Sequence, residues 1–129
     1  MKRKVLCLTV ALLVILATAS VFAASYEKTT YTIGYVHIPR SETYTANDYR
    51  KTDTANTAVI SCRDSAITAI RVWIGSYGRE RISNKKTIGE GISTTLSYYA
   101  GTDKYKKLYR TGFESYNHET GNAYLRFAP

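Results

Sequence analysis

The stretch AITAIRVWIG, residues 66–75, is the most apolar part of the chain after its amino-terminal segment. An apolar run of this length, with β-branched and aromatic residues, is typical of a strand. Because it is so apolar, we assign this strand to the centre of a sheet. The two-residue period of a strand gives two faces: Ile70, Val72 and Ile74 on one, and Arg71, Trp73 and Gly75 on the other.

Short segments of the same kind lie on both sides of this stretch. The chain contains 12 tyrosines and many threonines. Such residues favour strands over helices. With the turn residues between them, seven short strands predict an all-β fold, a small antiparallel β-sandwich or a partly closed barrel. The six strands expected besides 66–75 are 30–35, 58–62 (followed by a turn at Asp64-Ser65), 79–83, 92–99, 105–113 and 123–127.

Residues 1–23 have the pattern of a signal peptide. They begin with three basic residues, continue as an apolar run and end in small residues. We expect this helical segment to be cleaved after Ala23, or after Ala24. Residues 24–129 would then form a single secreted β domain. The alternative is an uncleaved anchor, since about 20 apolar residues can span a bilayer.

Loss of this segment changes both the charge and the cysteine count. It removes three of the 18 Lys and Arg and none of the 10 acidic residues, which leaves a net charge of +5. A positive exported protein favours an anionic cell-wall polymer or a membrane surface as partner. Because the protein is expected to be exported, we do not expect nucleic acid as a partner. Cys62 would be the only remaining cysteine, so no internal disulfide is possible. An exported domain without disulfides fits a Gram-positive bacterium better than a eukaryote. We also expect the protein to be a monomer.

The segment YYAGTDKYKKLYRTGFESY, residues 98–116, combines tyrosines with basic residues. We interpret it as a hairpin with a turn at 101–103, although an amphipathic helix over 104–116 is the alternative. Aromatic rings stack on sugars and cations bind phosphates, so this segment is the candidate binding site. At a sheet edge, its lysines would also protect the edge from pairing. The candidate binding residues are Lys104, Tyr105, Lys106, Lys107, Tyr109 and Arg110.

Residues suited to acid–base or metal chemistry are few. Glu114, His118 and Glu119 lie close together in the sequence, but the second histidine of a zinc-protease helix is absent. We interpret them as part of a polar loop. Cys62 lies in an apolar strand, where a thiol behaves as a small hydrophobic group. We therefore predict no catalytic residues, no metal and no cofactor.

Four short motifs resemble a family of small, signal-bearing secreted proteins of Gram-positive bacteria. The motifs are Tyr49-Arg50-Lys51-Thr52, Val72-Trp73-Ile74-Gly75, Ser83-Asn84 and Leu108-Tyr109-Arg110. This resemblance implies an all-β mature domain. No activity is established for that uncharacterised family, and some of its members are encoded near bacteriocin-type loci.

The sequence as a whole predicts a secreted, non-enzymatic protein that associates with the cell envelope or with extracellular anionic polymers. The resemblance provides an alternative, a secreted antimicrobial or bacteriocin-associated factor. A small extracellular hydrolase using Glu114 and His118 is the second alternative.

Overall fold

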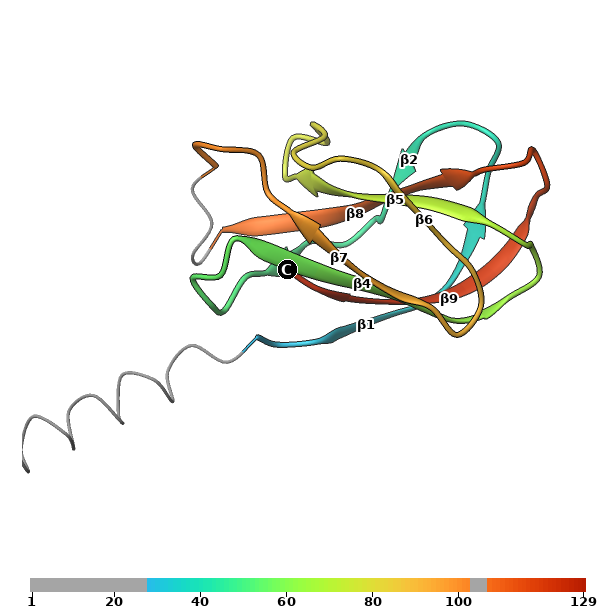
Figure 1. The fold of residues 1–129 in the computed structure, drawn as a ribbon, viewed down its shortest axis with the longest axis horizontal. Helices are drawn as coiled ribbons and strands as arrows, with labels where there is room; N and C mark the ends of the chain where they lie inside the picture. The colour runs from blue at the N-terminus through green and yellow to red at the C-terminus, as the bar shows by residue number, and fades with distance from the viewer. Residues whose placement is uncertain (1–27, 103–106) are drawn as a thin grey trace, which may run out of the picture.

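The computed structural model describes residues 28–102 and 107–129 and shows two antiparallel sheets packed face to face (Figure 1). The predicted all-β sandwich is confirmed, and the described strands do not close into a barrel. Sheet A has the strand order β1-β9-β4-β7. Its strands are β1 (Tyr31–Ile38), β4 (Thr57–Ser65), β7 (Ser93–Ser97) and β9 (Gly121–Ala128).

Sheet B has the order β2-β8-β5-β6, and β3 also pairs with β8. Three of its strands contain only two or three residues. The core lies between the two sheets, where Ile70, Val72 and Ile74 of β5 pack with Leu125 and Phe127 of β9. The strands of sheet B are β2 (Thr43–Tyr44), β3 (Tyr49–Arg50), β5 (Ile70–Ser76), β6 (Lys86–Ile88) and β8 (Leu108–Ser115).

The apolar stretch at 66–75 supplies β5, which lies inside its sheet between β8 and β6, as predicted. Its outer face is covered as well. Trp73 is fully buried, and the ring of Tyr44 packs edge-on against it at 5.8 Å between centroids. Trp73 lies opposite Gly112 of β8, where an added Cβ would come within 2.0 Å of the indole nitrogen. The absent side chain therefore makes room for the indole ring.

Several predicted boundaries are wrong. Residues 79–83 form no strand and make only isolated bridges, Gly75 with Arg81 and Ser83 with Tyr98. The turn expected at Asp64-Ser65 comes later, because a bulge between Cys62 and Asp64 carries β4 on to Ser65. The strands β2, β3 and β6 are too short to show a two-residue period, so the sequence did not predict them.

Within the predicted segment 98–116, residues 108–115 form a strand, so the helix alternative is wrong for them. The predicted hairpin is wrong too, because β7 lies in sheet A and β8 in sheet B, and the two strands do not pair. β8 is not at an edge. It pairs with β5 on one side and with β2 and β3 on the other, so edge protection does not explain Arg110, the one basic residue within this strand. The predicted signal peptide falls within residues 1–27, outside the described residues. In the described part of the chain, no helix is long and apolar enough to cross a membrane.

Candidate functional site

The structure describes three of the six predicted binding residues, and these three lie in different surroundings. Lys104, Tyr105 and Lys106 lie outside the described residues. Lys107 is exposed just before β8. Tyr109 is only 2% exposed, and its ring packs against that of Tyr98 at 5.0 Å between centroids. The ring of Tyr109 therefore belongs mainly to the core and is not presented on an open strand face.

Arg110 is held by the connection between β2 and β3. Its Nε donates to Asp48 Oδ1 at 2.6 Å, and its Nη1 donates to the carbonyl oxygen of Thr45 at 3.3 Å. The guanidinium carbon also lies 5.7 Å from the centroid of the Tyr77 ring. The two hydrogen bonds join segments more than 60 residues apart, so Arg110 mainly stabilises this end of sheet B.

A cleft of about 500 Å³ lies where β3, the start of β8 and the turn after β5 come together. We call it the β8 cleft. Two of its lining residues, Lys107 and Tyr109, belong to the predicted binding site. The lining combines exposed cations with aromatic and aliphatic side chains. It consists of Arg50, Ser76, Tyr77, Ile82, Thr102, Lys107, Leu108 and Tyr109.

Strand pairing explains how Arg50 reaches this cleft. β3 aligns Tyr49 with Tyr109 and Arg50 with Leu108. Tyr49 faces inward, where its ring packs edge-on against Phe127, so the next residue, Arg50, points outward. Tyr77, 65% exposed, is placed by the tight turn that follows β5. Neither residue was predicted as a binding residue: Arg50 lies on a two-residue strand, which gives no periodic signal, and Tyr77 lies in a turn.

A buried charge cluster lies on the chain just beyond β3. Lys51 is fully buried, and its Nζ donates to the carboxylate of Asp53 and to the carbonyl oxygen of Thr57. Lys28 Nζ lies 3.4 Å from the other carboxylate oxygen of Asp53. Burial lowers the pKa of the Lys51 ammonium, while its hydrogen bond to Asp53 acts in the opposite direction. This cluster fastens the segment between β3 and β4 to the core.

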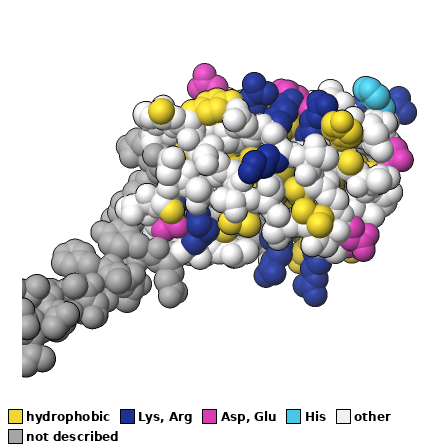
Figure 2. Space-filling view, viewed as in Figure 1, with side chains coloured by type: hydrophobic (Ala, Val, Ile, Leu, Met, Phe, Trp, Pro, Cys, Tyr) yellow, Lys and Arg dark blue, Asp and Glu magenta, His cyan; other side chains and the backbone are white. Residues whose placement is uncertain are grey.

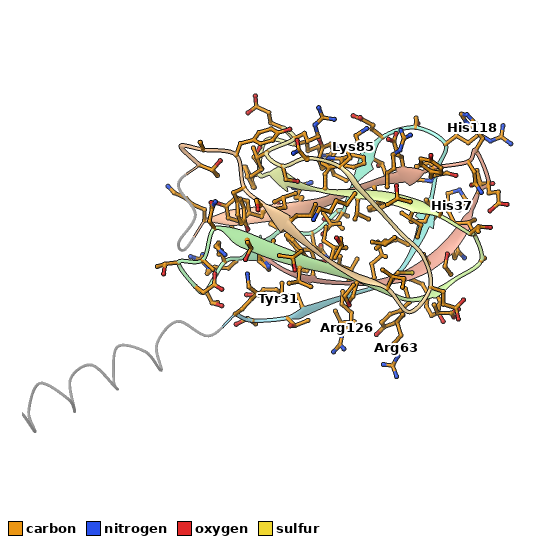
Figure 3. The ribbon with its side chains drawn as sticks, viewed as in Figure 1. Tyr31, His37, Arg63, Lys85, His118 and Arg126 are labelled. Atoms are coloured by element: carbon orange, nitrogen blue, oxygen red, sulfur yellow. The ribbon has the colours of Figure 1, made fainter. Side chains whose placement is uncertain are left out.

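The acid–base candidates lie in separate environments. Glu114 is 8% exposed and lies 2.7 Å from Lys85 Nζ and 3.6 Å from Arg71 Nη1. His118 is exposed in the turn before β9, at a φ of 64°, and its carbonyl oxygen accepts a hydrogen bond from Arg40 (Figure 3). The carboxylate of Glu119 accepts hydrogen bonds from Thr68, which lower its pKa.

Cys62 is buried in β4, as predicted. Its Sγ donates to the carbonyl oxygen of Asp64 at 3.3 Å, and burial raises the pKa of the thiol. Among the residues that the structure describes, no three His, Cys, Asp or Glu side chains gather to hold a metal ion.

Comparison of the chain with models of known families, with curated proteins and with solved structures finds no match. The resemblance to a secreted Gram-positive family therefore stays a prediction.

Proposed function

We propose that this chain is an exported, non-enzymatic protein that associates with the bacterial envelope by binding an anionic polymer in the β8 cleft. The observation that carries the proposal is the composition of the cleft. Arg50 and Lys107 are both exposed and both line it, beside the apolar and aromatic surface of Leu108, Ile82 and Tyr77.

This combination fits a polymer that alternates charged groups with carbon-rich units. A guanidinium and an ammonium both donate to phosphate or carboxylate oxygens. The tyrosine ring and the aliphatic side chains contact the faces of sugar or polyol units. Each repeat binds weakly, but a polymer presents many repeats, and rebinding along the chain raises the overall affinity. The positive charge of residues 24–129 adds long-range attraction.

Retention on isolated Gram-positive cell walls tests the proposal. The variant Arg50→Gln/Lys107→Gln removes both cations of the cleft. Exposed charged contacts contribute about 0.2–1 kcal/mol each, so losing two weakens retention roughly twofold to thirtyfold. The matched control is Arg81→Gln/Lys86→Gln, which removes the same charge from exposed residues that do not line the cleft. Equal losses in both variants, or no retention of the wild type, would contradict the proposal.

A further inference from the structure

The outer face of sheet A carries a second group of residues suited to a ligand. Tyr35 of β1 pairs with Tyr124 of β9, which pairs in turn with Asp64 of β4. The two rings meet edge to face, with centroids 5.1 Å apart. The hydroxyl of Tyr35 donates to Asp64 Oδ2 at 2.7 Å. These three residues form one continuous row across three strands.

A second row lies two residues further along β9, on the same face of the sheet. Arg126 pairs with Ser61 of β4, and Ser61 pairs with Ser93 of β7. Arg126 and Ser93 are exposed, and Ser61 is half-buried. This row therefore places one guanidinium beside two hydroxyl groups.

Arg63 lies between the two rows because of a bulge. The register of β4 against β9 shifts between Cys62 and Asp64, which leaves Arg63 as the additional residue. Bulges redirect side chains and are common next to binding sites. Arg63 and Arg126 project from the same side of the sandwich (Figure 3), and basic side chains protrude from the lower edge of the surface in Figure 2.

Two adjoining cavities occupy this face, and Arg63 lines both of them. The smaller one, of about 290 Å³, is lined by Ser61, Cys62, Arg63, Gly91, Ser93 and Arg126. No acidic side chain is among the described residues that line it. The larger one, of about 370 Å³, is lined by Tyr35, Arg63, Asp64, Glu90 and Tyr124. One cavity is thus cationic, and the other combines aromatic rings with carboxylates.

The two arginines differ in their partners from the cations that are paired with carboxylates. Lys51, Lys85 and Arg110 each form an ion pair with a carboxylate. Within the described chain, no carboxylate lies at ion-pair distance from Arg63 or Arg126. Two neighbouring guanidiniums without a counterion repel each other, so an anion bound between them lowers the electrostatic energy.

We propose that this face binds a charged saccharide, a sugar carrying a phosphate or carboxylate group. Arg63 and Arg126 bind the anionic group, helped by the hydroxyls of Ser61 and Ser93. The sugar ring lies against the tyrosine pair, as amphipathic rings pack on aromatic side chains. The carboxylates of Asp64 and Glu90 accept hydrogen bonds from the sugar hydroxyls.

The arrangement also explains why both parts of the ligand are needed. A small anion that carries no sugar gains only the contacts of the cationic cavity and none from the tyrosine pair, so inorganic phosphate binds weakly. A neutral sugar leaves the two arginines without an anion and is bound weakly too. This site is on the opposite sheet from the β8 cleft, so it does not depend on the function proposed for that cleft.

Titration of ¹⁵N-labelled residues 24–129, followed by NMR, tests the proposal with four compounds: glucose 1-phosphate, glucuronate, glucose and inorganic phosphate. We expect the two charged sugars to shift the amides of Ser61, Arg63, Ser93 and Tyr124. Their dissociation constants should be at least about tenfold below those of glucose and phosphate, the change that 1.4 kcal/mol produces. Tighter binding of one charged sugar shows whether the natural ligand bears phosphate or carboxylate.

Variants separate this site from the cleft. Arg63→Gln/Arg126→Gln changes two exposed side chains and should weaken binding of the charged sugars at least about tenfold. Arg50→Gln/Lys107→Gln, with the same change in charge, should bind them as the wild type does. The proposal is overturned if no compound shifts these amides, if phosphate binds as tightly as glucose 1-phosphate, or if the first variant binds normally.

Discussion

Replacing Gly112 with alanine tests whether the missing side chain at this position is what makes room for the ring of Trp73 on the outer face of β5. Gly112 lies on β8 directly opposite Trp73 of β5. An added Cβ would lie 2.0 Å from Nε1 and 2.1 Å from Cε2 of the indole, well inside van der Waals contact. We expect the variant to be strongly destabilised, because the ring has to move for the methyl group to fit.

The surroundings of the ring set the magnitude. Trp73 is fully buried, with the Tyr44 ring 5.8 Å away on an edge-on approach and Lys85 Nζ 4.6 Å from its centroid. Adding volume to a well-packed region costs about 1–3 kcal/mol. Because the indole is rigid and held between neighbours, we expect the cost at this site to lie at the upper end of that range, about 2–3 kcal/mol. For a domain of this size, that lowers the melting temperature by roughly 10–20 °C.

Urea denaturation followed by circular dichroism measures the loss. Gly78→Ala is the matched control, because its nearest neighbour would be Ser76 Oγ at 3.7 Å, an ordinary contact. The same alanine substitution in a Trp73→Leu background should cost less, since the smaller side chain leaves room for the methyl group. A Gly112→Ala variant within about 0.5 kcal/mol of the wild type, or an undiminished cost in the Trp73→Leu background, would refute the reasoning.

Two further predictions concern buried ionisable groups. Lys51→Met should lower the free energy of unfolding by about 3 kcal/mol, because Asp53 stays buried and keeps Lys28 as a cationic partner but loses Lys51. Urea denaturation measures this, and unchanged stability would contradict it. Burial raises the pKa of the Cys62 thiol, so a thiol reagent at neutral pH should modify it only in denaturant. The unfolded thiol ionises first as pH rises past its ordinary pKa of 9.0, so stability should fall there, and Cys62→Ala should remove that part of the fall.

Local patterns predicted the longer strands because each has enough residues to show its period or its apolar character. Residues 66–75 are the most apolar stretch after the amino-terminal segment, and the structure places the strand that they supply, β5, inside sheet B. The same reasoning failed for β2, β3 and β6, whose two or three residues carry no period. No local pattern indicated that Lys51 is buried, where Asp53 and Thr57 accept its hydrogen bonds.

The candidate sites were harder to predict than the strands, because they depend on pairing between distant segments. Arg110 meets Asp48 only because β8 pairs with the short strands before it. Arg63 joins Tyr124 and Arg126 through the register of β4 with β9 and its bulge. No local pattern specifies that register: the two-residue period of a strand places Tyr124 and Arg126 on one face but does not reveal their neighbours.

The salt dependence of retention on cell walls tests the central claim most directly. Purified residues 24–129 would be mixed with isolated Gram-positive walls, before and after removal of their phosphate-bearing polymers. Between about 0.01 and 1 M salt the screening length falls from about 30 to 3 Å. The account predicts retention that decreases steadily over this range and is lost on the stripped walls. Retention that is independent of salt, or equal on stripped walls, would contradict it.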